Sequence, residues 1–379
     1  MSLARTPLAA EALARLSPAA QKALAPGPGR MMASRGLLPL PRPGELASVL
    51  YQLVQIDPAT AAAAQASADG LPEKVLAGAL ADADVDPLVL DWLSGRARRA
   101  PALFEILVLN PSTADATIVA LATSGGGNEV DLIAGNEQRL LRCPDIIAAM
   151  YANPQARMST VDRAVELAIR NNVKVDGIAA WDELVRVMSG SGAATTASAA
   201  DDALFNQAMT GIADVADSSV VAASTEEGIE IPEGSEGQPE VDEKRVPVNK
   251  MSVPAKMRLA ALGNAFARSL LIRDPLRIVA IAAIKAPGVT ELEAAKYAGN
   301  HSLDNDVVRY IATRRDWTRL YGIKKSLCLN PKTPVAEASK LILHLRDNDV
   351  RMILKSKGVP SAVVAQARKI LAQRSGGGK

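Results

Sequence analysis

A short turn that begins with Asn-Pro and leads into an apolar pattern of helical period occurs three times in the chain. The turns start at Asn110, Asn153 and Asn330. After Asn330, apolar residues recur at the i, i+3, i+4 and i+7 spacing that gives a helix one buried face. When the turns are aligned without a gap, the copy at Asn153 keeps all four apolar positions and the copy at Asn110 keeps the first three. Repeated short helices that cannot bury a face alone predict a stack of helices, an α-solenoid.

Local signals indicate where these helices begin. Thr333 and Pro334 predict a helix start, with Thr333 as the N-cap and Pro334 as the first helical residue. Thr290 and Glu293 have the spacing of a capping box. Aromatic residues make up only 3% of the chain. The core must therefore consist of Ala, Leu, Val and Ile, which suits small, closely packed helices better than a β-sandwich.

Composition divides the chain into five segments. Residues 1–36 are rich in Ala and Pro and predict a leader that is disordered or partly helical. Residues 37–189 predict an N-terminal helical-repeat lobe, and residues 246–373 predict a basic C-terminal one. Between them, Gly190 to Glu243 contains 12 acidic residues and no Lys or Arg, so that 190–245 reads as a disordered acidic linker that carries at most a transient helix near residues 201–215. The tail, 374–379, is predicted to be disordered.

The turn motif resembles that of known helical repeats. Residues Asn330 to Pro334 match the pattern Asn-Pro-x-Thr-Pro at every position, whereas the copy at Asn110 lacks the final Pro and the copy at Asn153 lacks both Thr and Pro. The pattern is similar to HEAT/armadillo-like repeats and to the leucine-rich repeat variant, and the chain also resembles uncharacterised helical-repeat proteins of Ala/Arg-rich bacterial genomes. The resemblance covers 37–188 and 246–373. It implies an all-α solenoid that presents a binding surface and scaffolds partners, and it supplies no catalytic residues.

Charge is distributed unevenly along the chain. Residues 244–379 carry a formal net charge of +17, against −12 for 190–243 and −3 for 1–189. A basic lobe of this kind attracts an acidic protein segment or a nucleic acid, although the same residues could simply form the solvated face of a solenoid. The candidate residues for binding a polyanion or partner lie in two groups, the first with Trp317 and Tyr321 interleaved: Arg314, Arg315, Arg319, Lys324 and Lys325; and Arg346, Arg351, Lys355 and Lys357.

Other function classes find little support in the sequence. The two histidines, His301 and His344, lie far apart and outside any metal-binding spacing, and Ser302 and Asp304 beside His301 are typical of a helix start rather than a catalytic site. The two cysteines, Cys143 and Cys328, are expected to be reduced. No apolar run is long enough for a transmembrane helix. We therefore expect a cytoplasmic, non-enzymatic scaffold or adaptor without a cofactor, and we expect no small-molecule substrate. The alternative is a nucleic-acid-binding helical-repeat protein, of which a DNA glycosylase would be the enzymatic form.

Overall fold

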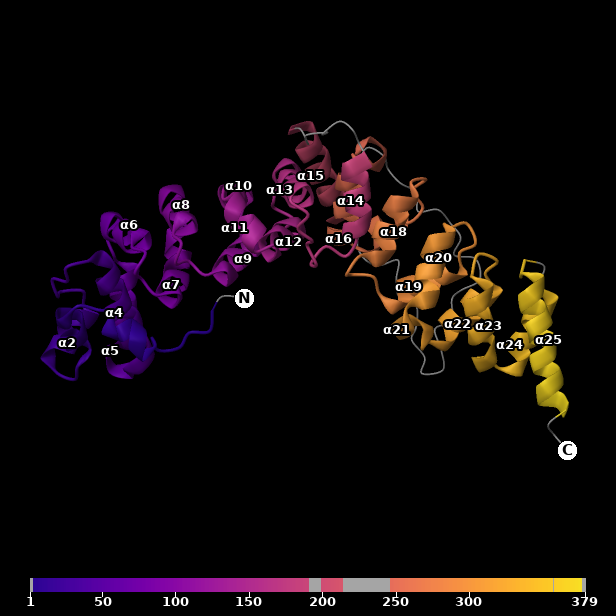
Figure 1. The fold of residues 1–379 in the computed structure, drawn as a ribbon, viewed down its shortest axis with the longest axis horizontal. Helices are drawn as coiled ribbons and strands as arrows, with labels where there is room; N and C mark the ends of the chain where they lie inside the picture. The colour runs from indigo at the N-terminus through magenta and orange to yellow at the C-terminus, as the bar shows by residue number, and fades with distance from the viewer. Residues whose placement is uncertain (1–2, 191–198, 214–245, 357, 377–379) are drawn as a thin grey trace. The chain divides into compact units, whose positions relative to one another are not determined.

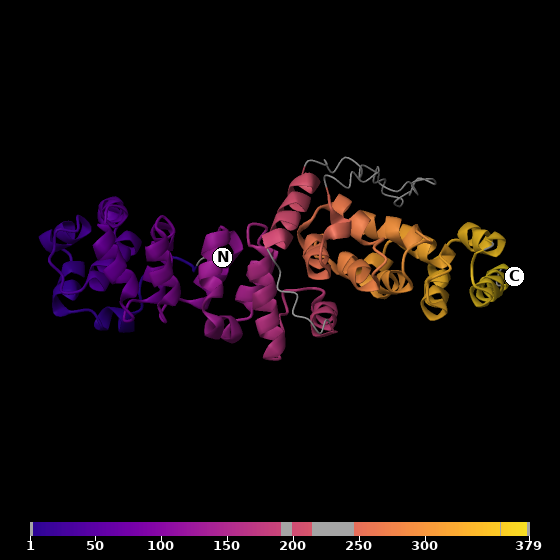
Figure 2. The same cartoon turned by 90° about the horizontal axis from the view of Figure 1, so that it is seen from above.

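The computed structural model describes residues 3–190, 199–213, 246–356 and 358–376. Throughout these ranges the regular structure is helical and no strand occurs, which confirms the predicted all-α class. The chain divides into two compact units, Met1–Gly177 (unit 1) and Ile178–Lys379 (unit 2). Figures 1 and 2 show the helices of both units from two directions.

Unit 1 consists of short helices, several of which carry Pro at the first helical position, where its missing N–H costs nothing. The helices are α1 (Ala10–Ala14), α2 (Pro18–Leu24), α3 (Pro28–Ser34), α4 (Pro43–Ile56), α5 (Pro58–Asp69), α6 (Glu73–Ala81), α7 (Pro87–Ala97), α8 (Pro101–Leu109), α9 (Asp115–Ser124), α10 (Gly127–Ala134), α11 (Glu137–Arg142), α12 (Asp145–Ala152) and α13 (Met158–Arg170).

Helices of unit 1 pack against helices two or three places along the chain as well as against their neighbours. Helix α6 contacts α8 and α8 contacts α10, while α4 contacts α7 and α9 contacts α12. In Figure 1, α6, α8 and α10 accordingly follow one another along one side of the unit. Alternate helices thus bury their apolar faces against each other.

The N-terminal segment, 1–36, contributes to this packing. Helices α2 and α3 contact α4 and α5, and Leu8, Ala20 and Ala33 are buried. The Gln52 side chain accepts a hydrogen bond from the Leu8 N–H at 2.7 Å. The packed region therefore begins well before residue 37, where the sequence placed its start. Alanine-rich helices without a strong apolar stripe can pack because their small side chains let backbones approach closely.

Unit 2 comprises the remaining helices: α14 (Trp181–Gly190), α15 (Ala199–Ala213), η2 (Val248–Lys250), α16 (Val253–Leu262), α17 (Ala265–Leu271), α18 (Arg277–Lys285), α19 (Glu291–Gly299), α20 (Asn305–Thr313), α21 (Arg315–Thr318), α22 (Tyr321–Leu329), α23 (Val335–Leu341), η3 (Ile342–His344), α24 (Asp347–Lys355) and α25 (Ser361–Gly376). Contacts again skip along the chain: α16 with α18, α18 with α20, α19 with α22, and α22 with α24. Helix α25 lies beside α24 in both views.

Two elements of unit 2 differ from the sequence-based boundaries. The sequence placed residues 181–188 at the end of the N-terminal lobe, but α14 packs against α16 and α18. The acidic stretch was expected to hold at most a transient helix, yet α15 buries Phe205, Ala208 and Ile212. The guanidinium of Arg258 lies 4.8 Å from the centroid of the Phe205 ring. The acidic composition of the whole stretch led to a prediction of disorder, although α15 has one apolar face. The rest of the predicted linker, 191–198 and 214–245, lies outside the described residues.

The repeated Asn-Pro turns share one hydrogen-bond arrangement. Each asparagine is buried at the end of its helix. The Asn330 amide donates to the carbonyls of Ala298 (2.8 Å) and Asn300 (3.3 Å), and its oxygen accepts from the Lys332 N–H (3.0 Å). Asn110 and Asn153 donate in the same way to main-chain carbonyls about 30 residues earlier. The amide therefore satisfies carbonyls at the end of an earlier helix and closes its own turn.

One predicted helix start is wrong. Thr333 does not cap α23, which begins at Val335 after Pro334. The Thr333 hydroxyl is buried and donates to the Leu327 carbonyl at 2.6 Å, so it satisfies the end of the preceding helix. Thr113 does the same with Leu107 at 2.7 Å. By contrast, the capping box of Thr290 and Glu293 is confirmed.

Candidate functional site

The predicted basic residues lie on the outer parts of helices α20 to α24 in unit 2. Arg314, Arg315 and Arg319 are exposed around α21, and Lys324 and Lys325 are half-buried on α22. Arg346, Arg351 and Lys355 are exposed at or within α24, whereas Lys357 lies outside the described residues. Because α22 contacts both α21 and α24, it lies between the two predicted groups.

Asp349 links these groups directly. Lys325 Nζ lies 3.0 Å from an Asp349 carboxylate oxygen, and the Tyr321 hydroxyl donates to the other oxygen. The Tyr321 oxygen also accepts from the Arg346 N–H at 2.9 Å, and the Arg346 guanidinium lies 5.1 Å from the centroid of the Tyr321 ring. Partial burial alone would raise the pKa of Asp349, but the bonds from Tyr321 and Lys325 outweigh it and lower that pKa. Lys325 therefore forms an ion pair within the protein, and Asp349 already neutralises its charge, so that it contributes little to the binding of a partner.

Several other cations in this region have polar neighbours of their own. Arg319 lies 3.8 Å from Asp316 in an exposed pair. Arg351 donates to the Asn348 side chain at 3.3 Å. Such exposed contacts contribute about 0–1 kcal/mol and are readily exchanged. These residues remain available to a partner, although each first has to leave a local contact.

Arg314 is held in a different way. Its guanidinium carbon lies 5.8 Å from the centroid of the Tyr310 ring and 5.5 Å from that of Trp317. The two rings meet edge to face with centroids 6.0 Å apart. The interleaved Trp317 is buried, so it supports the basic surface from beneath instead of standing out from it. The sequence carries a signal for this contact, because Tyr310 and Trp317 lie four residues before and three residues after Arg314.

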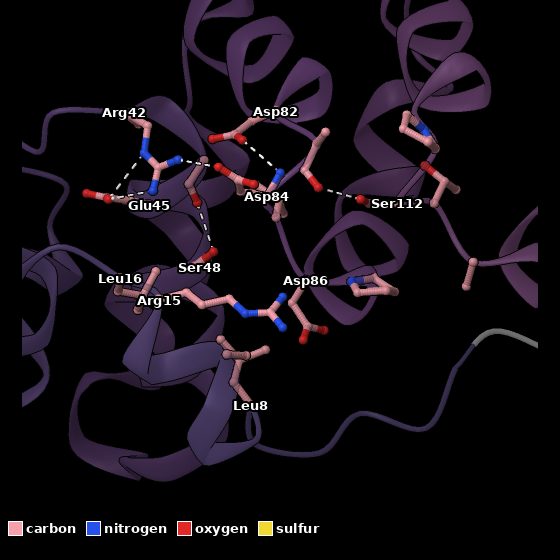
Figure 3. A pocket seen from close by; sticks show the side chains of 18 of the residues that line it. Leu8, Arg15, Leu16, Arg42, Glu45, Ser48, Asp82, Asp84, Asp86 and Ser112 are labelled. Atoms are coloured by element: carbon pink, nitrogen blue, oxygen red, sulfur yellow. Dashed lines mark hydrogen bonds and ion pairs between the residues drawn. The ribbon is translucent and has the colours of Figure 1, made fainter.

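Unit 1 contains a cavity of about 670 Å³ that sequence reasoning missed. It lies among the N-terminal segment around Arg15, the start of α4, and the turns before α7 and α9 (Figure 3). Its size falls in the ordinary range for ligand pockets. No sequence motif marks it, because its wall combines five segments separated along the chain. The charged side chains that line it are Arg15, Arg42, Arg142, Glu45, Asp82, Asp84, Asp86 and Asp115.

Most of these charged groups are already satisfied by one another. Arg42 donates to Glu45 at 3.0 Å and to Asp84 at 2.7 Å, and Arg142 donates to Asp115 at 2.6 Å. The hydrogen bonds that Arg42 donates to Glu45 and Asp84 raise the pKa of Arg42. In Figure 3 the Arg15 side chain extends toward Asp86. The cavity is thus bounded by internal ion pairs, of which one joins the start of α4 to the turn before α7 and another joins the end of α11 to the start of α9.

The hydroxyl groups that line the cavity are not arranged for nucleophilic catalysis. Ser48 donates to the Gly44 carbonyl at 2.9 Å, Thr113 donates to Leu107, and Ser112 donates to Ala83. Activation of a serine or threonine requires a general base within hydrogen-bond reach. Among the lining residues there is neither His nor Cys, and these three hydroxyls serve main-chain carbonyls. The arrangement favours a structural or binding role for the cavity.

Residues around the histidines and cysteines have structural roles. Ser302 donates to the Asn300 side chain at 2.7 Å, and Asp304 accepts from the Asp306 N–H at 2.8 Å, as expected for a helix start. Both cysteines are free thiols. Burial raises the pKa of Cys328 to about 12, so its thiol is protonated at neutral pH. A protonated, buried thiol is a poor nucleophile.

Across the described parts of the chain, no helix combines the length and apolar character that a bilayer crossing requires. No protein-family model matches the sequence, and neither characterised proteins nor solved structures give a significant match.

Proposed function

We propose that the protein is a non-enzymatic helical-repeat scaffold of the cytoplasm, a two-lobed α-solenoid that binds an acidic protein partner through the basic surface of unit 2. Here "basic surface" means Arg314, Arg315, Arg319, Lys324, Arg346, Arg351 and Lys355. The solenoid is supported by helix contacts that skip along the chain and by the repeated asparagine turn, which joins helix ends about 30 residues apart.

One observation carries the choice of partner. Arg314 and Arg315 are exposed, and no carboxylate of the described residues forms an ion pair with either. Elsewhere in the described chain, some exposed arginines have an acidic neighbour, as Arg142 and Arg157 do, and others such as Arg99 and Arg163 have none. Two consecutive arginines without a carboxylate partner concentrate positive charge at this place, and an acidic partner would neutralise it.

The absence of a paired nucleophile and base around the cavity supports the non-enzymatic part of the proposal. The +17 charge of residues 244–379 keeps nucleic acid as the second candidate. The two candidates differ in how binding responds to salt. Each phosphate contact releases counter-ions, so affinity for nucleic acid falls steeply as salt rises.

Affinity purification with a matched charge-reversal variant tests the proposal. The full-length protein and the variant Arg314→Glu/Arg315→Glu/Lys324→Glu would be compared in native extracts, with and without nuclease. We expect an acidic protein that copurifies with the wild type, resists nuclease and is lost from the variant, with direct binding then confirmed using purified components. Recovery of nucleic acid in place of protein would favour the second candidate. A partner retained equally by the variant would contradict the assigned surface.

A further inference from the structure

Arg314 is approached by two aromatic rings, whereas Arg346, the other cation of the basic surface with a ring contact among the described residues, is approached by one. Two aromatic rings, those of Tyr310 and Trp317, lie within 6 Å of its guanidinium, the range of cation–π attraction. A ring attracts the charge but supplies no carboxylate oxygen. The guanidinium therefore keeps its full positive charge and its capacity for a two-pronged pair with a carboxylate.

The rings themselves are anchored in the fold. Tyr310 is also approached by Lys285, whose Nζ lies 5.9 Å from the ring centroid. Lys285 forms an ion pair with the buried Glu183 at 3.0 Å, which ties α18 to α14. Of the two cations at this ring, Lys285 is thus neutralised, whereas Arg314 has no carboxylate partner among the described residues. The arrangement fixes the position of one unneutralised guanidinium at the surface.

We infer that Arg314 is the anchor of the basic surface: its ring-held guanidinium forms a bidentate pair with an Asp or Glu carboxylate in an acidic segment of the partner protein. This inference rests on the proposed function. Ordering a long side chain at an interface costs about 0.5–1.5 kcal/mol. The two rings restrict the Arg314 side chain before binding, so that cost is smaller at this position than at Arg351 or Lys355, for which no ring contact occurs among the described residues.

The surroundings favour a carboxylate-bearing segment over nucleic acid. Single-stranded nucleic acid is bound on exposed aromatic faces that stack with bases. Here Trp317 is buried and lies beneath Arg314, and Tyr321 is occupied by Arg346 and Asp349. Acidic side chains such as Asp316 and Asp347 are also interspersed among the cations, and both are exposed. They would repel a continuous phosphate backbone, whereas spaced carboxylates of a peptide can avoid them.

Binding of a fluorescein-labelled oligoglutamate peptide to the full chain, followed by anisotropy at low and physiological salt, tests the inference. Arg314→Lys keeps the charge but removes the planar fork, and we expect binding to weaken about fivefold or more. Arg351→Lys is the matched control in the same surface and should change binding less than about twofold. Tyr310→Leu removes one ring and leaves the charge, so we expect a loss of about two- to fivefold. Circular dichroism checks that each variant is folded.

The outcomes separate this inference from the proposed function. If the wild type binds the peptide and Arg314→Lys weakens binding no more than Arg351→Lys does, Arg314 is not the anchor, although the surface still binds acidic segments. If the wild type binds no peptide at either salt concentration, both proposals are wrong. Tighter binding of a single-stranded oligonucleotide of equal charge would overturn the assignment of an acidic protein segment.

Discussion

At the scale of single residues, a buried asparagine amide pairs with main-chain groups at two helix ends. The Asn330 side chain makes three hydrogen bonds to main-chain groups, two outward to an earlier helix end and one within its own turn. Buried polar groups are costly unless they are satisfied, so the amide and the carbonyls depend on each other. The same dependence holds at Asn110 and Asn153. Loss of one amide leaves several buried main-chain groups unpaired.

We predict that Asn330→Ala lowers the free energy of unfolding of unit 2 by about 2–4 kcal/mol, because buried carbonyls and an N–H lose their partner. Denaturant unfolding followed by circular dichroism measures the loss. Asn348→Ala is the control, since Asn348 is exposed and its hydrogen bond to Arg351 is long. That change should stay within about 0.5 kcal/mol. Equal effects of the two substitutions would mean that the buried amide has no special role.

At the scale of elements, helix starts in unit 1 are brought together by close backbone approach and by arginines. Gly44 in the first turn of α4 faces the turn before α7, where a Cβ would lie 2.5 Å from Val85 Cγ2 and closer still to the Asp82 carboxylate. Arg98 at the end of α7 donates to Glu129 in the first turn of α10 at 2.8 and 2.9 Å, and to the Ser124 carbonyl at 3.0 Å. Both contacts join elements that are not consecutive.

Gly44→Ala should lower the stability of unit 1 by about 1–3 kcal/mol, because the added methyl group has to displace the side chains of Asp82 and Val85 in the turn before α7. Gly95→Ala in α7 provides a matched control. A Cβ at Gly95 meets no atom within 4 Å, so alanine there should be neutral or stabilise by about 0.5–1 kcal/mol through its higher helix propensity. Thermal unfolding of both variants measures the difference. A stable Gly44→Ala variant would show that α4 does not require this approach.

The Arg98–Glu129 contact should make unit 1 sensitive to acid. Hydrogen bonds from Arg98 lower the pKa of Glu129 below its ordinary value of 4.5. A carboxyl with a lowered pKa stabilises the fold above its ordinary pKa, and this contribution is lost as pH falls through the folded-state value. Glu129→Gln should therefore destabilise the protein at pH 7 by about 1 kcal/mol and have progressively less effect below about pH 4.

Denaturant unfolding at a series of pH values tests this dependence. Glu105→Gln serves as the control, because Glu105 is exposed on α8 and has no ion pair within the described residues. Its effect should be small at every pH. If the effect of Glu129→Gln is the same at acid and neutral pH, the ionised carboxylate is not what stabilises the contact.

At the scale of the whole molecule, the two units differ in extent from the lobes that composition suggests. Unit 2 includes α14 and α15, which precede the basic lobe predicted from residue 246. Helix α15 buries Phe205 beneath Arg258, and α14 buries Glu183 against Lys285. Removing these helices would expose apolar surface and leave Lys285 without its carboxylate.

We predict that the fragment 178–379 is more stable than the fragment 246–379, by at least about 3 kcal/mol, the cost expected for loss of one large buried side chain such as Phe205. Denaturant unfolding compares the fragments. Phe205→Ala in the longer fragment should lower its stability by much of this difference. Fragment 1–177 should retain helical circular dichroism by itself, since its core is its own. Equal stability of the fragments 178–379 and 246–379 would return the boundary to residue 246.

The sequence predicted helices well and their connections poorly. Apolar spacing after Asn330 located buried residues such as Ala338 and Ile342, because a helix repeats its buried face regularly. The acceptors of the Asn330 amide could not be predicted, since main-chain carbonyls are the same at every residue. Thr333 was assigned to the following helix because its hydroxyl fits a cap equally well in either direction. The cavity around Arg15 has no local signal at all. The sequence alone does not show which residues far apart in the chain contact each other, and both the asparagine acceptors and the cavity depend on such contacts.

The asparagine turn also bears on how such a chain can change its length. Each amide donates to main-chain carbonyls at the end of an earlier helix. Every helix has unpaired main-chain carbonyls at its C-terminal end, whatever its side chains are. A duplicated segment would therefore contain its own asparagine donor. The carbonyl acceptors would already be present in the neighbouring helix, so that no compensating substitution is needed there. Insertion or deletion of whole helix pairs then disturbs apolar packing only. Gene duplication can lengthen a protein of this kind in steps of about 30 residues while side chains on the outer surface diverge.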